Sequence, residues 1–190
     1  MLNDLDLARV SSFGRPQSRT RKGQQMKPGY HPVELRSRNK PHGFAARTLK
    51  NLENVERAYS VGADVHVVTQ LMLSLLGVVI FPMEQKDTMG LLEEVALENL
   101  HEFPWCKGWD IEHDSYKTKT TNAFILLRHV RNAVSHRNVM FSSDSRDINQ
   151  VKIAFHDRHL SDKDQWWWAE IKARHLRDFC HGLLHYIVDS

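Results

Sequence analysis

The sequence predicts an all-α fold, a bundle of about five helices with one β-hairpin inserted between the fourth helix and the fifth. Apolar residues recur at helical spacing over most of the chain from residue 44 onward. A period of two replaces that spacing only at about 138–157. Apolar residues also make up 41% of the 190 residues, which is enough for a folded core and excludes a wholly disordered chain.

Basic residues are concentrated near the N-terminus. Residues 1–50 hold eleven Lys and Arg against three Asp and Glu, whereas 51–190 hold fifteen against twenty. Residues 1–43 are rich in Arg, Ser, Gly, Pro and Gln and show no regular period, so we expect a flexible basic arm there. The arm is either a solvated tail, which its composition favours, or a segment that attracts nucleic acid. We expect residues 44–190 to form one helical domain.

The cysteine content and the apolar runs indicate where the protein works. Cys106 and Cys180 are too few for a disulfide framework and fit a reducing compartment. The opening residues MLNDLDLARV do not resemble a secretory signal. The longest apolar run, from Val65 to Phe81, has 17 residues and several polar interruptions, which predicts a buried helix rather than a membrane span. We therefore expect a cytoplasmic protein with no membrane segment.

Four helices are expected before the hairpin. The first runs from Phe44 to about Ser60, and the second follows the apolar run and ends at Pro82, which cannot continue a helix. The third is amphipathic and acidic, from Thr88 to Phe103. Residues 104–119 contain turn residues and are interpreted as a loop. Thr120 or Thr121 then caps the fourth helix, which runs to about His136.

The hairpin and the last helix complete the predicted domain. The segments NVMFSS and INQVKIAFHD flank the turn segment DSRD, and Val151, Ile153 and Phe155 alternate with polar neighbours, which predicts a hairpin at about 138–157. Residues 164–188 place Trp168 and other apolar residues on one broad face and are expected to form the final helix. The WWW stretch at 166–168 either anchors this helix in the core, the plainer reading, or stacks on nucleic-acid bases.

The stretch FILLRHVRNAVSHRNVMF raises the question of function, because an apolar helix carries several cations on its far half. Cations near a helix C-terminus are common, since they complement the partial negative charge of the last carbonyls. Three Arg–His pairs have four to six intervening residues: Arg36/His42, Arg131/His136 and Arg174/His181. The first lies in the basic arm, where nothing would hold it in place. The third fits a polar stripe on an amphipathic helix equally well.

The pair Arg131/His136 differs because it stands at the exit of the most apolar helix in the second half of the chain. Five residues turn an ideal helix by about 140°, so the two side chains would not share a face of a continuous helix. They converge only if the helix ends or tightens near Ser135, or if a second subunit completes the site. This geometric condition is a prediction of the sequence.

These residues resemble a known family. LLRHVRNAVSHRNV resembles the signature of the HEPN superfamily, whose Arg-polar-x-x-x-His element ends a core helix. VVTQLMLSLLGVVIFP is similar to an early helix of a HEPN subfamily found on plasmids and among bacterial defence genes. In that subfamily a hairpin and a Trp-bearing final helix follow the motif, much as VKIAFHD and QWWWAEI do here. The resemblance covers about residues 44–188.

The resemblance implies a homodimeric, metal-independent endoribonuclease that needs no cofactor and builds a composite active site from both subunits. His136 is the expected acid/base, because an imidazole can take a proton from the ribose 2′-hydroxyl and return one to the leaving oxygen. Arg131 is expected to stabilise the phosphate, and Asn132 to orient the histidine or the phosphate. Arg128 and Arg137 are candidates for binding the RNA backbone. A toxin or phage-defence setting, with an antitoxin or another regulatory partner, is implied by the family only.

Two other readings remain open. One is a non-catalytic HEPN dimer that binds RNA, a nucleotide or a partner protein. The other is a metal site at Cys180, His181 and His185, because two histidines one helical turn apart can bind zinc. The chain contains no H-E-x-x-H motif, so a polar helix face is the favoured explanation and no metal is expected.

Overall fold

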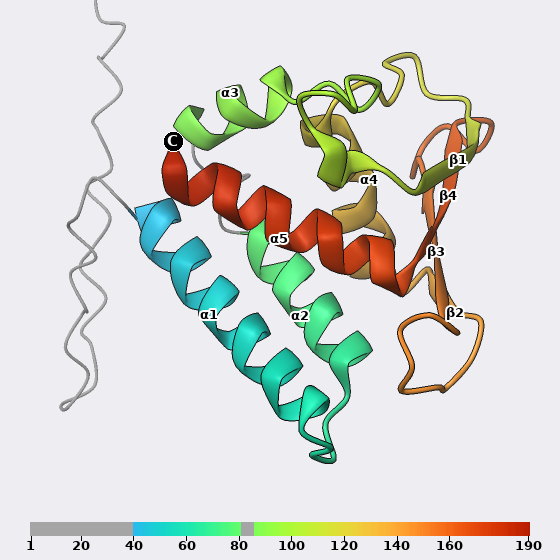
Figure 1. Cartoon of the computed structure of the whole chain (residues 1–190). Coiled ribbons are helices and arrows are strands. Elements are labelled where there is room, and N and C mark those ends of the chain that lie inside the picture. Colours follow the sequence, from blue (N-terminus) through green and yellow to red (C-terminus); the bar gives the residue numbers. More distant parts are fainter. Residues whose placement is uncertain (1–39, 81–85) are drawn as a thin grey trace, which may run out of the picture. The chain divides into compact units, whose positions relative to one another are not determined.

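The computed structural model describes residues 40–80 and 86–190, so the arm predicted at 1–43 lies almost entirely outside the described residues. Within them the chain forms five α-helices and a four-stranded antiparallel sheet (Figure 1). The prediction of an all-α bundle with one hairpin is therefore wrong. The domain is a mixed α and β structure in which the helices lie on one side of a sheet.

Three helices form the purely helical part of the domain. These are α1 (Lys40–Ser60), α2 (Val67–Ile80) and α5 (Ala173–Asp189), which pack against one another (Figure 1). Their contacts are apolar, with Leu52, Leu71 and Leu183 fully buried. Helices are present in both N-terminal segments where the apolar spacing predicted them, and α1 begins already at Lys40. Burial of these stripes stabilises the packing, because removing apolar area from water is favourable.

The third helix is shorter than predicted. Helix α3 spans Lys86–Glu94, and the predicted helix over 88–103 is therefore wrong beyond residue 94. The following backbone pairs instead with the chain just before the fourth helix: Leu97 N–H donates to Thr121 O, and Ala123 N–H donates to Val95 O. A short 3₁₀ turn, η2 (Pro104–Cys106), follows. Tertiary pairing thus overrides the helical period of this segment.

The sheet contains two strands that the sequence analysis missed. Its strands are β1 (Trp109–Asp114), β2 (Val139–Phe141), β3 (Lys152–Arg158) and β4 (Trp166–Lys172), in the order β1-β4-β3-β2. The pair β2/β3 lies in the segment of the expected hairpin, whereas β1 lies in the expected loop and β4 in the expected last helix. Trp167, Ala169 and Ile171 are buried between partly exposed neighbours, so the period of β4 is two.

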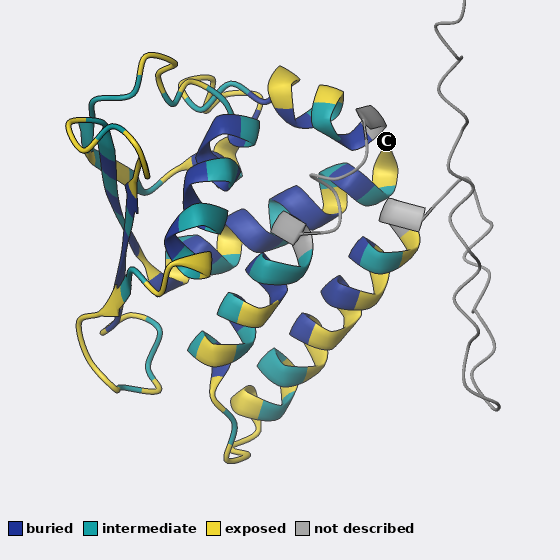
Figure 2. Cartoon of the chain, turned by 180° about the vertical axis from the view of Figure 1, so that it is seen from behind, coloured by how far each residue is buried: buried dark blue, intermediate teal, exposed yellow. Residues whose placement is uncertain are grey.

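The two faces of the sheet differ. Helices α4 (Ala123–Ser135) and α5 pack on the inner face, where Phe155, Trp167 and Ile171 are buried (Figure 1). Over the opposite face the described part of the chain places no helix, and its strands carry partly and fully exposed residues (Figure 2). Helix α4 starts at an Asn122 cap, whose side chain accepts a hydrogen bond from Ile125 N–H at 3.0 Å. The cap is therefore neither Thr120 nor Thr121.

Candidate functional site

The motif helix α4 ends at Ser135, which is one of the two conditions that the sequence analysis gave for Arg131 and His136 to converge. Its last residue is Ser135, and His136 is the C-cap. Arg137 N–H donates to Val134 O at 3.0 Å and Asn138 N–H donates to Ala133 O at 2.8 Å, which is the double hydrogen bond of a Schellman motif. Arg137 adopts a φ of 59°, a conformation that usually needs glycine. Arg137 therefore holds a strained backbone conformation, and the turn that it forms changes the direction of the chain directly after His136.

A cavity of about 550 Å³ opens beside this helix end. Its walls come from the C-terminal half of α4, the segment after β1, and the β3–β4 connection. The lining includes three cations and three imidazoles: Lys117, Arg128, Arg158, His129, His136 and His159. A concave site with this charge is suited to an anion such as a phosphate ester.

The structure brings some predicted residues to the cavity and not others. His136, Asn132 and Arg128 line it. Arg131 and Arg137 do not belong to its lining. Arg131 is partly buried, and among the described residues its side chain forms no hydrogen bond or ion pair. A single chain therefore gathers the histidine, the asparagine and one arginine, but not the arginine of the motif.

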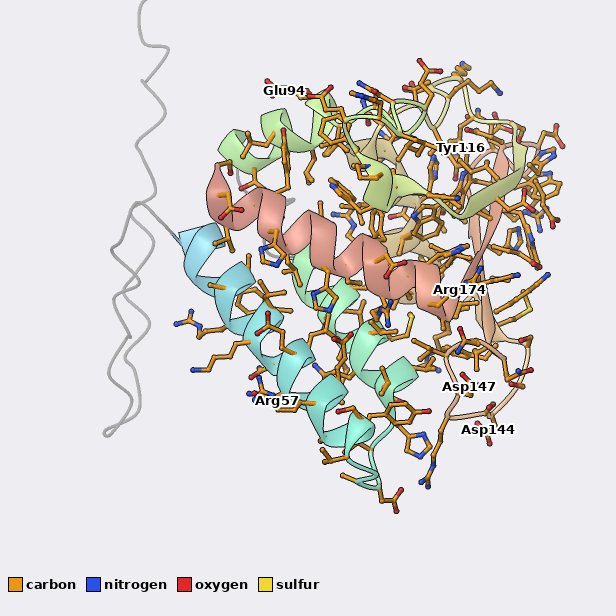
Figure 3. All side chains as sticks on the ribbon, viewed as in Figure 1. Arg57, Glu94, Tyr116, Asp144, Asp147 and Arg174 are labelled. Carbon is orange, nitrogen blue, oxygen red and sulfur yellow. The ribbon has the colours of Figure 1, made fainter. Side chains whose placement is uncertain are left out.

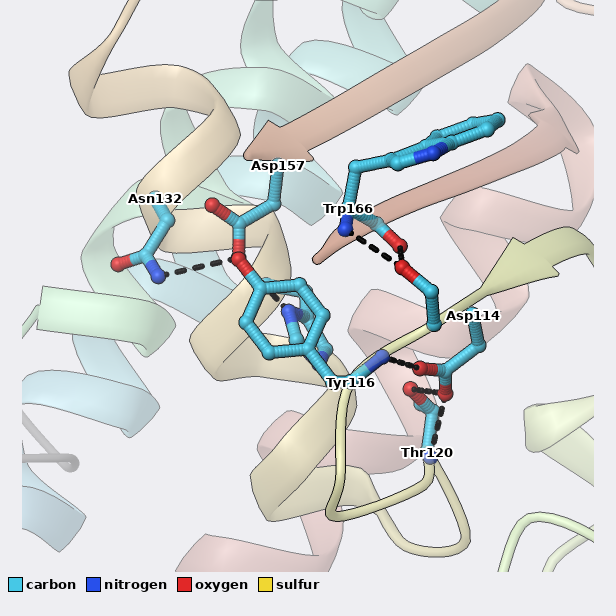
Figure 4. A network of polar contacts seen from close by, with 8 residues as sticks. Asp114, Tyr116, Thr120, Asn132, Asp157 and Trp166 are labelled. Carbon is cyan, nitrogen blue, oxygen red and sulfur yellow. Dashed lines mark hydrogen bonds and ion pairs between the residues drawn. The ribbon is translucent and has the colours of Figure 1, made fainter. Parts of the chain in front are cut away.

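A buried carboxylate organises the wall of the cavity (Figure 4). Asp157, at 2% exposure, lies 2.7 Å from His129 Nδ1 and accepts a hydrogen bond of 3.1 Å from Asn132 Nδ2, both through Oδ2. It is also the hydrogen-bond partner of the Tyr116 hydroxyl. One carboxylate on β3 thus holds side chains from α4 and from the segment after β1. The amide of Asn132 points at Asp157 with its nitrogen, which leaves its carbonyl oxygen on the far side (Figure 4).

The charge state of Asp157 follows from these partners. Burial raises the pKa of its carboxyl, but the hydrogen bonds from His129 and Asn132 outweigh burial and hold the pKa below its ordinary value. Asp157 is therefore an ionised acceptor at neutral pH. Burial of Tyr116 itself, together with the charge of Asp157, raises the pKa of the Tyr116 hydroxyl, which therefore stays protonated at neutral pH.

His129 is a buried imidazole with one unused nitrogen. Since the Asp157 carboxylate can only accept, Nδ1 of His129 carries the shared hydrogen. The ring stacks on Trp167 at 5.0 Å between centroids, and it also contacts Tyr116. Nε2 is buried and has no hydrogen-bond partner within the described residues, although His129 lines the cavity. A buried polar atom left unpaired costs about 1–3 kcal/mol, which points to a ligand or water as its partner.

Comparison with protein families settles the relationship. The chain matches the family model described as HEPN pEK499 p136 over residues 34–190. It belongs to this family of HEPN domains. Searches of the curated proteins and of the solved structures give no match. Membership of the HEPN family connects the chain with nuclease or other RNA-related function.

Three residues of this candidate site escaped the sequence analysis: Tyr116, His129 and Asp157. Two signals could have found them. Asp157 stands two residues after the buried Phe155 in an alternating strand, so it occupies an inward position where an unpaired carboxylate would be costly. His129 precedes Asn132 by three residues, which places both on one face of α4. Tyr116 gave no signal, because β1 had been interpreted as a loop.

The other candidates from the sequence lie outside this cavity. His181 Nε2 contacts the Glu56 carboxylate at 3.0 and 3.1 Å, and Arg174 Nε donates to His175 at 3.2 Å, so Arg174 and His181 have separate partners. Arg174 lies near the start of α5, and Tyr116 lies in the segment after β1 (Figure 3). No three metal-ligating side chains cluster within residues 40–80 and 86–190. In the same ranges no helix has the length and apolar content of a membrane span.

Proposed function

We propose that this HEPN domain is a metal-independent endoribonuclease that acts as a homodimer. The observation that carries the proposal is the end of α4 at Ser135, after which His136 joins a cavity rich in cations. The His136 imidazole is exposed and lies beside side chains whose positive charge attracts phosphate. The 2′-hydroxyl that the chemistry needs confines the substrate to RNA.

His136 acts as the acid/base. It takes the proton of the ribose 2′-hydroxyl, and the resulting oxygen attacks the adjacent phosphorus. The bond from phosphorus to the 5′-oxygen of the next nucleotide breaks, and an imidazolium returns a proton to that oxygen. One His136 can serve both parts of this step, because the proton that it takes from the 2′-hydroxyl turns it into the imidazolium that protonates the leaving oxygen.

Arg131 serves the composite cleft of the dimer. Arg131 does not line the single-chain cavity, and its side chain has no partner among the described residues. We expect this of an arginine whose binding site is completed by a second subunit. Its guanidinium would grip phosphate oxygens as negative charge builds on them. Asn132 orients the phosphate from a position fixed by Asp157. Arg128 and Arg137 bind the RNA backbone.

Substitution of His136 tests the proposal. His136→Ala should lower RNA cleavage about 10²–10⁴-fold because the acid/base is lost. Arg131→Ala should lower it about 10²–10³-fold because charge stabilisation is lost. His185→Ala is the matched control, since His185 is exposed on α5 away from the cavity and should leave cleavage unchanged. Cleavage by His136→Ala within a few-fold of the parent protein would refute the assignment.

A second measurement tests metal independence. The proposal expects full cleavage in excess EDTA, because no step uses a metal ion. Loss of cleavage in EDTA, with recovery on addition of a divalent cation, would contradict the mechanism.

A non-catalytic HEPN domain is the second candidate, and one observation favours it. Within one chain the cavity contains His136 and Asn132 but not Arg131, so a monomer lacks the complete motif. Such a domain would bind RNA or a nucleotide through its cations without cleaving it. We also propose a toxin or defence role that an antitoxin or another partner holds in check. Expression in cells therefore distinguishes the nuclease from the non-catalytic domain. Toxicity that His136→Ala relieves would support the nuclease, and equal toxicity of both forms would support binding alone.

A further inference from the structure

We propose that the outer face of the sheet is a stacking surface for single-stranded RNA that leads to the cavity, an inference that rests on the proposed ribonuclease function. The surface, here called the aromatic face, consists of His113, His156, Arg158, Trp166 and Trp168. The reasons are the geometry of its rings, its charge and its continuity with the cavity.

The strand period splits the three consecutive tryptophans between the two faces of β4. Trp167 is fully buried on the inner face and stacks on His129. Trp166 and Trp168 lie two residues apart on the outer face and are partly exposed. Anchoring the core, the plainer role expected for this stretch, therefore accounts for Trp167 but not for its two neighbours.

Histidines on the adjacent strands extend these two indoles into a continuous aromatic surface. In the sheet register, Trp168 is paired with His113 on β1 and with His156 on β3. His113 stacks on Trp166 with centroids 3.5 Å apart and planes at 9°, and His156 contacts Trp168 at 5.7 Å. Bases stack on such rings without sequence preference, since every base has an aromatic face.

The charge next to the rings fits a phosphate backbone. A groove of about 430 Å³ is lined by His156, Arg158, Lys163, Trp166 and Trp168, and no carboxylate takes part in its lining. At the other end of the same face Glu170 forms an ion pair with Lys152 at 3.7 Å. Among the described residues, Arg158 and Lys163 form no ion pair beside the rings. Asp110 stands opposite Glu170 in the sheet register, so both of these carboxylates lie outside the groove, toward the other end of the face. Cations beside exposed rings, in a groove lined by no carboxylate, fit a polyanion whose bases can stack, so the groove favours RNA.

The aromatic face is continuous with the proposed active site. Arg158 lines both the groove and the cavity that contains His136. A strand whose bases stack on Trp166 and Trp168 can therefore pass the end of β3 and deliver a phosphate to the cavity. The aromatic face would hold single-stranded substrate and disfavour duplex RNA, whose bases are already stacked.

Binding measurements on a protein that does not cleave RNA test this inference. The full chain carrying His136→Ala is titrated into a labelled single-stranded oligoribonucleotide and followed by fluorescence anisotropy. Trp166→Ala and Trp168→Ala should each raise Kd about 10- to 100-fold, and the phenylalanine variants should retain most of the affinity. Leu73→Ala is the matched control, because Leu73 is an exposed apolar residue on helix α2, outside the sheet, and should change Kd less than about twofold. Arg158→Ala should lower the salt slope of log K by about 0.7.

Each outcome bears on the inference. Variants with native circular dichroism whose Kd is unchanged would overturn it, as would duplex RNA that binds as tightly as the single strand. Loss of dimerisation in Trp166→Ala and Trp168→Ala with unchanged RNA affinity would show a protein interface instead. If the parent protein never cleaves RNA but the tryptophan variants bind RNA more weakly than the protein with both tryptophans, the proposed function fails and the RNA-binding surface stands. If cleavage depends on His136 but the tryptophans do not affect binding, this inference alone fails.

Discussion

Two histidine–carboxylate pairs in this domain share their chemistry and differ in their surroundings. His129 and Asp157 lie 2.7 Å apart, both almost fully buried, at a cavity wall between α4 and β3. His181 and Glu56 lie 3.0 Å apart and join α1 to α5, with about a quarter of each side chain exposed. The buried carboxylate has further donors in Asn132 and Tyr116, whereas the described residues give Glu56 no side-chain partner besides His181. The degree of burial and the number of hydrogen-bond donors therefore distinguish the pair at the candidate site from the pair that only links two helices.

The two pairs shift pKa values in opposite directions, and each shift favours the charged form of its group. The hydrogen bond from His181 to Glu56 raises the pKa of this imidazole, with burial acting against it. Asp157, despite burial, has a lowered pKa because of its donors. The surface pair therefore depends on a protonated histidine, and the buried network depends on an ionised carboxylate.

Removal of each carboxylate gives the largest difference between the pairs. Asp157→Ala leaves the Nδ1 hydrogen of His129 and the Asn132 amide without an acceptor in the interior, and should lower the free energy of unfolding by about 3–5 kcal/mol. Glu56→Ala should lower it by less than about 1 kcal/mol. Urea denaturation measures both. Equal losses in the two variants would show that the buried network does not hold the site together.

A smaller effect is expected from the histidines, and it separates activity from stability. His129→Gln should lower RNA cleavage about 10–100-fold, because it disturbs the partner that fixes Asp157 and hence Asn132. His181→Gln should leave cleavage unchanged, since His181 lies outside the cavity. Initial rates on one RNA, with circular dichroism as a folding control, decide this. Equal cleavage by His129→Gln and the parent protein would leave the network a purely structural role.

The pH dependence of stability gives the smallest effect. Because the pKa of His181 is raised, its contribution is complete below about pH 6.5 and is lost as pH rises through the folded-state pKa. We expect a loss of less than about 1 kcal/mol, absent in Glu56→Gln. Asp157 acts in the opposite sense, with stability present above about pH 4 and lost as pH falls through its lowered pKa. Urea denaturation from acid to alkaline pH would reveal both, and a His181 effect that persists in Glu56→Gln would contradict the assignment.

The sequence predicted the features that depend on local patterns. Apolar spacing located α1 and α2, and the Arg131/His136 spacing led to the requirement for a helix end near Ser135. The HEPN family followed from the same residues. These features depend on few residues close together in the chain, which is where periodicity and motifs carry information.

The features that were missed depend on pairing between distant segments. Strand β1 pairs with β4 across more than fifty residues, and neither strand has a period that excludes a loop or a helix on its own. Trp168 appeared to continue the apolar face of α5, although it belongs to the outer face of β4. The Asp157 network was hidden for the same reason, because it joins α4 to β3 and to the segment after a strand that had not been predicted.

The composite dimer site is the central claim, and complementation between two inactive variants tests it most directly. Arg131→Ala and His136→Ala proteins are each prepared as homodimers, then mixed under conditions that allow subunits to exchange. Our proposal predicts that the mixture regains RNA cleavage well above either variant, since a mixed dimer has one intact arginine and one intact histidine facing each other across its interface. A mixture no more active than its two components would place both groups in the same subunit's site and contradict the proposal.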